Sequence, residues 1–401
     1  MAKKKRGGIF QIGLYGLDTN LLVVLSFIMI FGFIMIYSAS YYKAGLSESF
    51  DYDSMYFLKR QVIYSMVGIV GMLIVSCIDY HIWRHLAVLG YLTSLALVLL
   101  LKVPSLRVEA NGAVRWLRFG PIQFQVAEPV KLLMIIFMAT LITARGRHMK
   151  SWVSMFRMIL PSAVVSVLLW KISENMSTAA ILLGTAVFMI YVVHPEQWKF
   201  FLCAGIVTIG VAAVIYYVKN LDPQALSAAD FRFARIRAWL EPYEYETDKA
   251  FQSLQGLYAI GSGGLWGKGL GNSIQKLGKI PEPYNDYIYA IICEELGIFG
   301  AGLIILLFIY LLYRIYTISQ TAADMLGRML AIGVMSHISL QVILNLLVVT
   351  HLFPTTGVTL PFFSYGGTAS CFLLVEIGLV LSVNKYSVKK RLDAIREARF
   401  E

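Results

Sequence analysis

Ten stretches of almost uninterrupted apolar residues run through this 401-residue chain. A transmembrane helix needs about 20 apolar residues, and soluble chains are about 45–50% apolar, whereas 58% of this chain is hydrophobic and 15% is charged. These values exclude a soluble enzyme and a protein with a single membrane anchor. We therefore predict an all-α polytopic membrane protein of about ten transmembrane helices. The predicted spans are 21–40, 62–77, 82–101, 129–142, 158–170, 178–193, 200–218, 288–313, 329–349 and 370–383.

The basic residues predict how these helices are oriented. If the N-terminus lies inside, the inward segments carry 18 of the 35 Lys and Arg residues, and the much longer outward segments carry 16. Because Lys and Arg collect on the cytoplasmic side, both chain ends are expected in the cytoplasm. The predicted parts are a basic N-terminal tail at 1–20, a membrane domain at 21–383 and a basic C-terminal tail at 384–401. No nucleic-acid-binding motif accompanies the charge, so no nucleic acid partner is expected.

Three long segments face outward in this orientation. The largest, 219–287, is a predicted extracellular loop between helices seven and eight, and its Trp, Tyr, Phe and Leu content predicts that it is partly ordered. A second segment lies at 102–128. The third, 350–369, is apolar but interrupted by Pro and Gly. Irregular backbone is tolerated at membrane depth only where protein covers it, so this segment is expected to be buried against the helices.

The acidic residues near the eighth span are candidates for chemistry. Asp286 lies at the outer mouth of this span, where it is either a reactive carboxylate or an ordinary helix N-cap. Glu294 and Glu295 follow eight and nine residues later, about 12–13 Å along a helix. Adjacent helix residues point about 100° apart, so one of the two is expected to face a cavity and the other to pair or bond with the backbone.

Glu128 and Lys131 open the fourth span at i,i+3 spacing, so they share a helix face. This pattern fits a helix-end ion pair or a functional pair inside the membrane. Arg115 and Arg118 flank Trp116 at the outer surface. Guanidinium groups beside an aromatic ring suit a sugar and a diphosphate, although an interfacial Trp anchor is the common alternative.

The glycine-rich run at 261–271 resembles a phosphate-binding loop but departs from its pattern. The first glycine is five residues before Gly267-Lys268, and Gly269 stands where such a loop has Ser or Thr. Backbone N–H groups of the run could still bind a diphosphate, and plain turn geometry is the alternative. No zinc-binding cluster or nucleophilic serine motif is present.

Taken together, six motifs resemble those of the SEDS family, the polytopic bacterial proteins that include FtsW, RodA and SpoVE, and the resemblance covers nearly the whole chain. Thr359-Leu-Pro361 is more similar to the FtsW and SpoVE branch than to the elongation branch. The motifs are Lys59-Arg60-Gln61, Asn111-Gly-Ala-Val-Arg-Trp-Leu117, Gln125-Val-Ala-Glu-Pro-Val-Lys131, the run from Gln252 to Gly271, the run from Pro281 to Gly297, and Gly357-Val-Thr-Leu-Pro-Phe-Phe-Ser-Tyr-Gly-Gly367.

This resemblance implies a peptidoglycan glycosyltransferase that joins lipid II, an undecaprenyl-diphosphate-linked disaccharide peptide, into β-1,4 glycan at the outer leaflet. It places the essential acid on Asp286, as the general base of an inverting reaction. A divalent cation, Mg or Mn, is a candidate cofactor. The implied substrate-binding residues are Arg60, Arg115, Trp116, Glu128, Lys131, Lys268 and Ser364, with Glu294 and Glu295 in supporting roles.

The implied partners are a class B penicillin-binding protein and other divisome proteins. The implied location is the bacterial cytoplasmic membrane, at the division or sporulation septum. Two other functions remain open at this point. One is a flippase or another transporter of polyprenol-linked lipids, and the other is a scaffold for the penicillin-binding protein. The family's residues also differ at some positions here, since Gly278 stands where many members have an acidic residue.

Overall fold

The computed structural model describes residues 16–110, 113–120, 122–145, 151–220, 231–245 and 250–398, so most of the predicted N-terminal tail lies outside it. Within these residues, ten helices are long and apolar enough to cross a membrane. The prediction of an all-α polytopic membrane protein with about ten spans is therefore confirmed. The ten are α1 (Thr19–Leu46), α2 (Tyr56–Cys77), α3 (His81–Leu100), α4 (Ala127–Arg145), α5 (Trp152–Ser173), α6 (Met176–Val193), α7 (Trp198–Lys219), α11 (Ile288–Gln320), α12 (Met325–Val349) and α13 (Gly367–Glu397).

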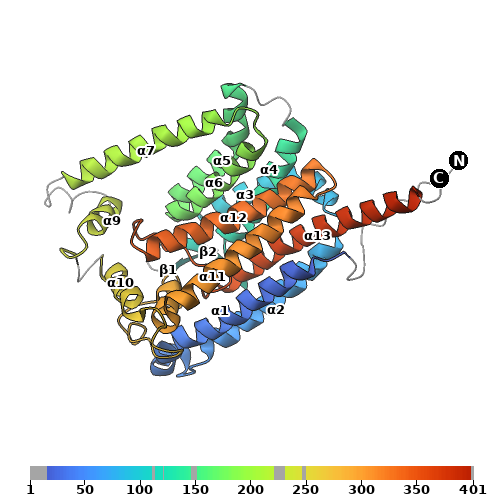
Figure 1. Cartoon of the computed structure of the whole chain (residues 1–401). Helices are drawn as coiled ribbons and strands as arrows, with labels where there is room; N and C mark the ends of the chain where they lie inside the picture. Colours follow the sequence, from blue (N-terminus) through green and yellow to red (C-terminus); the bar gives the residue numbers. More distant parts are fainter. Residues whose placement is uncertain are drawn as a thin grey trace.

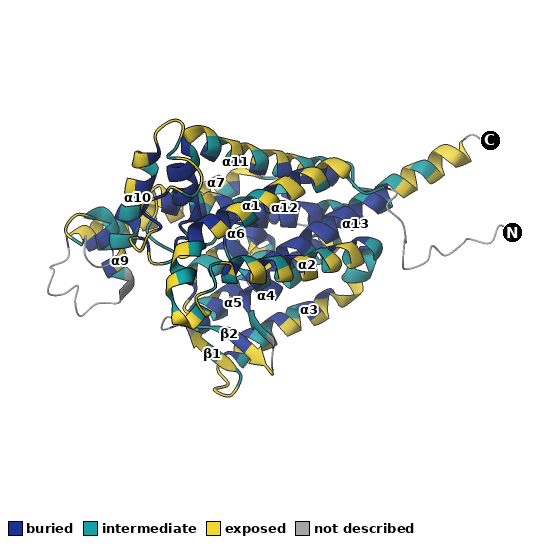
Figure 2. Ribbon diagram, turned by 90° about the horizontal axis from the view of Figure 1, so that it is seen from below, coloured by how far each residue is buried: buried dark blue, intermediate teal, exposed yellow. Residues whose placement is uncertain are grey.

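Helix α12 lies at the centre of the bundle (Figure 1). It packs against α4, α6, α11 and α13, and α13 in turn packs along α2. Most residues in the apolar windows of α4, α12 and α13 are buried inside the protein, while only 28% and 17% of those of α2 and α3 are buried (Figure 2). The inner helices therefore have room for polar residues shielded from lipid, because their neighbours supply hydrogen-bond partners.

Helix α7 differs from the other spans because the rest of the described chain buries very little of its surface. Only 6% of its apolar window is buried, and Figure 1 shows it set apart from the bundle. Its outer end packs against α9 (Phe231–Leu240), a short helix of the long outer loop. A second helix of that loop, α10 (Phe251–Gly263), packs against α11. The expectation that segment 219–287 is partly ordered is thus confirmed for its described residues.

The second outer segment forms a three-stranded antiparallel sheet, which we did not predict from the sequence. Its strands are β1 (Arg107–Ala110), β2 (Ala113–Phe119) and β3 (Ile122–Gln125). Trp116 lies in the middle strand, opposite Val108 and Gln125. The sheet anchors to the bundle through Leu117, which is fully buried, and places Arg115 and Trp116 on a short rigid platform.

The second half of the third outer segment is mostly buried, as expected, whereas Leu352 and Phe353 in its first half are 67% and 41% exposed. Leu360 and Phe363 are 1% and 0% exposed although the backbone there is irregular. Gly32 of α1 lies so close that an added Cβ would be 2.4 Å from the Phe362 carbonyl oxygen. The close packing of α1, α11 and α12 around this segment supplies the cover that irregular backbone needs.

Helix α13 is longer than the predicted span. It continues to Glu397, so most of the predicted C-terminal tail is helical. The extension follows from local sequence, since 384–397 has no Gly or Pro and five of its 14 residues are Lys or Arg, which are good helix formers. The start of the described chain meets this helix, because Asn384 Nδ2 donates to the Gly16 carbonyl oxygen at 2.8 Å. Both ends of the membrane domain therefore lie on the same side, as an even number of spans requires.

Candidate active site at the outer end of the bundle

Asp286 lies two residues before α11 and is not the helix N-cap. The N-cap is Tyr287, and no side chain caps the helix there. The N-cap interpretation of Asp286 is therefore wrong, because the helix begins one residue later than that interpretation requires. The carboxylate is partly buried, and Gln252 of α10 contacts its Oδ1 at 3.5 Å. Its lone pairs are thus not committed to capping the helix.

Burial raises the pKa of Asp286 to about 6. The negative charge of Glu282 acts in the same direction, while the Gln252 amide and the positive charge of Arg235 oppose it. A carboxylate with a pKa near 6 is ionised at neutral pH and is a stronger base than an ordinary Asp. The environment therefore suits Asp286 to accept a proton from a substrate hydroxyl.

Three consecutive carbonyl groups hold the chain in place at Asp286. The Tyr284 oxygen accepts from the Tyr365 N–H at 2.9 Å, and the Asn285 oxygen accepts from Ser364 Oγ at 2.7 Å. The Asp286 oxygen accepts from Asn345 Nδ2 of α12 at 2.8 Å. Residues far away in the sequence thus fix the backbone that carries the candidate base. We call the three donors to these carbonyl oxygens, which are the Tyr365 N–H, the Ser364 hydroxyl and the Asn345 amide, the carbonyl cradle.

Ser364 is therefore committed to protein contacts. It is 4% exposed, donates to the Asn285 oxygen and accepts from the Leu360 N–H at 2.7 Å. The structure places it directly beside the Asp286 segment, but with its hydroxyl directed at the backbone. Its predicted contact with substrate stays a prediction.

Glu128 and Lys131 form the predicted ion pair inside the bundle. Lys131 Nζ lies 3.0 Å from Glu128 Oε2, and the side chains are 5% and 7% exposed, respectively. Lys131 Nζ also donates to Gln341 Oε1 of α12 at 3.4 Å. From its sequence position, Lys131 could orient Asp286 only if the fourth and eighth spans, α4 and α11, were neighbours. Instead, α12 packs against both helices, so the connection runs through α12.

The three remaining outer candidates come from two elements, α2 and β2. Arg60 is exposed near the start of α2, lies over the Tyr56 ring at 4.4 Å, and is near the Tyr365 hydroxyl. Arg115 and Trp116 are partly buried on β2. Burial lowers the pKa of Arg115, and the nearby Glu174 carboxylate opposes this effect. Arg60 thus lies beside the carbonyl cradle through Tyr365, whereas Arg115 and Trp116 lie on the sheet.

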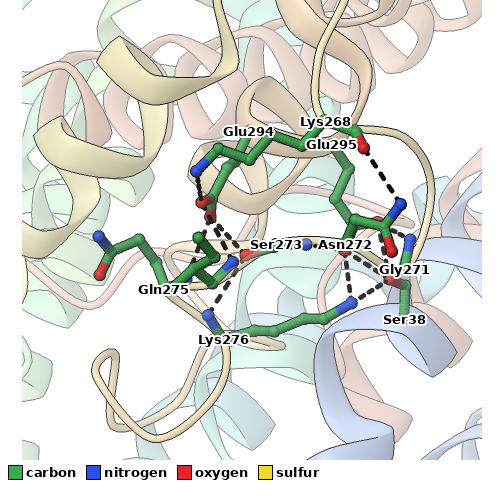
Figure 3. Close-up of polar contacts among 10 residues, drawn as sticks. Ser38, Lys268, Gly271, Asn272, Ser273, Gln275, Lys276, Glu294 and Glu295 are labelled. Carbon is green, nitrogen blue, oxygen red and sulfur yellow. Dashed lines mark hydrogen bonds and ion pairs between the residues drawn. The ribbon is translucent and has the colours of Figure 1, made fainter.

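Glu294 and Glu295 both hold the glycine-rich loop, contrary to the expectation that they face different surroundings (Figure 3). Glu295 is 0% exposed, pairs with Lys276 at 2.6 Å and accepts from the N–H groups of Gly271 and Ser273. Glu294 pairs with Lys268 at 2.7 Å and accepts from the N–H groups that follow Ser273. The loop curls around α11, so the Glu294 and Glu295 side chains both contact it although they point in different directions from the helix.

The glycine-rich loop therefore binds internal carboxylates. Gly271, the last residue of the run, donates its backbone N–H to Glu295. The backbone N–H groups of residues 273–275, which follow the run, donate to Glu294 and Glu295. Gly267 and Gly297 have φ values of +77° and +68°, and an added Cβ on Gly297 would be 2.4 Å from the Gly267 nitrogen. Only glycine fits at both positions. Lys268 is 29% exposed at its side chain and already paired, so its contact with substrate stays a prediction.

Several residues of this region were missed by sequence reasoning. Asn345 and Gln341 recur at i,i+4 spacing on α12, and two buried amides on one face of a membrane helix were a readable signal. Lys276 and its partner Ser38 of α1, 3.0 Å apart, are separated by 238 residues, and no local pattern links them. No group of three or more His, Cys, Asp or Glu side chains suited to a metal is found in the described part of the chain.

The fold and the site together define a polytopic membrane protein with a partly buried carboxylate at its outer end and an ion pair inside the bundle. Comparison with known proteins identifies the family. The family model of FtsW, RodA and SpoVE, described as "Cell cycle protein", matches residues 18–389. The chain belongs to this family, and the resemblance found in its motifs is confirmed.

Two curated relatives illustrate the membership. Stage V sporulation protein E of Bacillus subtilis (strain 168) is 35% identical over 370 residues, which cover 92% of this chain and 97% of that protein. A probable peptidoglycan glycosyltransferase FtsW of Geobacter sp. (strain M18) is 34% identical over 371 residues, covering 92% and 97%. Both come from the branch that Thr359-Leu-Pro361 favours.

Two solved structures share the fold. One, titled "Structural coordination of polymerization and crosslinking by a peptidoglycan synthase complex", has a TM-score of 0.74 and 24% identity and covers 94% of this chain and 99% of its own. The rod shape determining protein RodA of Thermus thermophilus has a TM-score of 0.60 and 24% identity, covering 92% and 97%. At these identities the likeness establishes the fold alone.

Proposed function

We propose that this chain is a peptidoglycan glycosyltransferase in which Asp286 acts as the general base. The activity class rests on family membership and on relatives that are named for it. The observation that carries the residue assignment is the Asp286 carboxylate. It is partly buried at the outer end of α11, has a pKa of about 6, and does not cap the helix.

The proposed substrate is lipid II. Its sugar is α-linked to a diphosphate, and a β-1,4 product requires inversion at the anomeric carbon in a single displacement. In this step Asp286 removes the proton from the acceptor hydroxyl while the hydroxyl oxygen attacks the anomeric carbon. The bond between the anomeric carbon and the diphosphate oxygen breaks, and the diphosphate leaves with the bonding electrons.

Cations must stabilise the negative charge on the departing diphosphate. Arg60 lies beside the carbonyl cradle, Arg115 on the sheet and Lys131 in the bundle, so we assign them this role together. Glu128 then keeps the Lys131 ammonium charged and oriented, and Trp116 offers a ring face to a sugar. A divalent cation, Mg or Mn, is the proposed cofactor; the substrate phosphates would supply ligands to it, and it would neutralise part of their charge.

Partners and location follow from the family by the same proposal. A similar fold occurs in a structure whose title names a peptidoglycan synthase complex, and we propose a class B penicillin-binding protein as this chain's partner. The lipid-facing residues of α11, including the exposed Leu306 and Tyr313, offer it a surface within the membrane. We place the protein in the bacterial cytoplasmic membrane at the septum, with both termini cytoplasmic and other divisome proteins nearby.

A reconstitution with purified lipid II tests this function against the two alternatives. The wild-type protein, alone and with a class B penicillin-binding protein, is incubated with lipid II in detergent, and glycan ladders are resolved on a gel. We expect polymer from wild type and none from Asp286→Ala of equal folding and lipid II binding. Movement of lipid II across vesicles without lengthening would indicate a flippase. Absence of both activities, with partner binding retained, would indicate a scaffold.

A further inference from the structure

Asn345 has an unusual set of contacts for a residue in the middle of a membrane bundle. It is 0% exposed, and its Nδ2 donates to the Asp286 oxygen at 2.8 Å and to the Val358 oxygen at 2.7 Å. Both N–H bonds of the amide are thereby used. Its Oδ1 is buried and has no hydrogen-bond partner among the described residues. The amide therefore acts here as a double donor.

The Asp286 carbonyl depends on this donor. Asp286 precedes the N-cap Tyr287, so its carbonyl lies outside the hydrogen-bond ladder of α11. The contact from Asn345 is thus what ties the base-bearing residue to α12. The other carbonyl that Asn345 holds, Val358, belongs to the buried irregular segment that also supplies Ser364 and Tyr365 to the cradle.

Gln341 lies one helical turn before Asn345 on α12 and continues the same polar face. Its Nε2 donates to the Thr359 oxygen at 3.1 Å, while its Oε1 accepts from Lys131 Nζ at 3.4 Å. One face of α12 therefore contacts the ion pair of α4, the buried segment 358–359 and the Asp286 backbone. These hydrogen bonds join the Glu128–Lys131 pair to the backbone of Asp286 through α12.

We propose that Asn345 is a positioning residue for the Asp286 carboxylate, and that Asn345 and Gln341 together hold it in register with the Glu128–Lys131 pair. The inference rests on the proposed role of Asp286 as base. A general base must lie within hydrogen-bond reach of the proton it removes, and a displacement of about 1 Å costs about 100-fold in rate. Asn345 does not touch substrate, so its loss affects the rate of the chemical step rather than substrate binding.

The test compares Asn345→Leu with wild type in lipid II polymerisation by the full chain with its class B partner. Leucine keeps the branched shape of asparagine, with somewhat larger end groups, and removes both donated hydrogen bonds. We expect kcat to fall about 100-fold while KM changes less than about twofold. The acidic limb of the kcat–pH profile should move to lower pH, because a released segment lets water reach the carboxylate. The pH to which the acidic limb moves is set by the groups that still affect the pKa of Asp286 in the variant, namely Glu282, Arg235 and Gln252.

Ser336→Ala is the matched control. Ser336 is also buried on α12, but its hydroxyl donates to the Ile332 oxygen within the same helix. We expect it to leave kcat, KM and the pH profile unchanged. If Asn345→Leu does not fold, Ser364→Ala replaces it, since it removes the donor to the neighbouring Asn285 oxygen. The same pattern is expected there, with a fall in kcat of about tenfold.

Two results would overturn the inference. The first is a wild-type kcat for folded Asn345→Leu. The second is a reduced kcat with an unshifted acidic limb, which a general loss of structure would produce. Asp286→Asn in the same assay separates the inference from the proposed function. If Asp286→Asn polymerises lipid II normally, the base assignment fails; if it is inactive and Asn345→Leu is normal, only the positioning role fails.

Discussion

Removal of the Lys276 ammonium should destabilise the outer end of the protein strongly. Lys276 Nζ lies 2.6 Å from Glu295 Oε1, and both side chains are 0% exposed. Ser38 and the N–H groups of Gly271 and Ser273 also donate to this carboxylate, so Lys276→Met leaves its hydrogen bonds but no countercharge. Breaking a buried ion pair on one side costs about 3–5 kcal/mol.

This cost translates into a measurable shift of the unfolding temperature. The unfolding entropy is about 2.1 cal/mol/K per residue, so about 4 kcal/mol lowers the midpoint of a 401-residue chain by about 5 °C. Intrinsic tryptophan fluorescence during heating of the purified protein in detergent measures it. Lys279→Met is the control, because Lys279 is exposed three residues further along the same loop. We expect its midpoint to match wild type.

The double variant Lys276→Met, Glu295→Gln tests the electrostatic reason. Glutamine is neutral and keeps a carbonyl oxygen for the loop N–H groups, so the double variant should unfold at a higher temperature than Lys276→Met alone. A wild-type midpoint for Lys276→Met would refute the reasoning. A double variant no more stable than the single one would also refute it, since the loss would then come from packing.

Three further predictions concern the site and its supports. Asp286→Asn should reduce polymerisation at least 100-fold. It should also raise stability by about 1–3 kcal/mol at pH 8 but not at pH 3, because the raised pKa of Asp286 makes the wild-type fold lose stability as the pH rises from 3.8 to about 6. Equal melting curves of variant and wild type at both pH values would contradict this. Lys131→Met should destabilise the protein by about 3–5 kcal/mol. The double variant Lys131→Met, Glu128→Gln should recover stability but not activity. Glycan synthesis by the double variant would contradict the role of the Lys131 charge. Gly297→Ala, at φ +68°, should cost more than about 1 kcal/mol, which the melting midpoint checks, and an unchanged midpoint would contradict the close approach to Gly267.

Hydropathy was sufficient to predict the spans because lipid imposes one rule on every membrane helix. It could not place their ends. The continuation of α13 to Glu397 depends on helix propensity in a polar segment, which a search for apolar runs passes over. The sheet at 107–125 was missed because β1 and β3 have only four residues each, and the longer β2 does not alternate clearly between apolar and polar side chains.

The candidate site was predictable residue by residue but not as an arrangement. The i,i+3 spacing predicted the Glu128–Lys131 pair correctly, because one helix contains both. The glycine-rich loop illustrates the limit. Its free N–H groups suggested an external anion, while the anions it binds are Glu294 and Glu295 of a helix that begins later in the chain. Contacts between segments that are distant in the sequence, such as that of Asn345 with Asp286, cannot be predicted from residue spacing.

The pH dependence of lipid II polymerisation tests the central claim most directly. The purified chain with its class B partner is assayed from pH 5 to pH 8, and initial rates of glycan formation are measured at saturating lipid II. The account predicts that the rate falls as the pH is lowered through about 6, where the Asp286 carboxylate takes up a proton, and that Asp286→Asn makes no polymer at any pH. A folded Asp286→Asn protein with wild-type rates and the same acidic limb would contradict it.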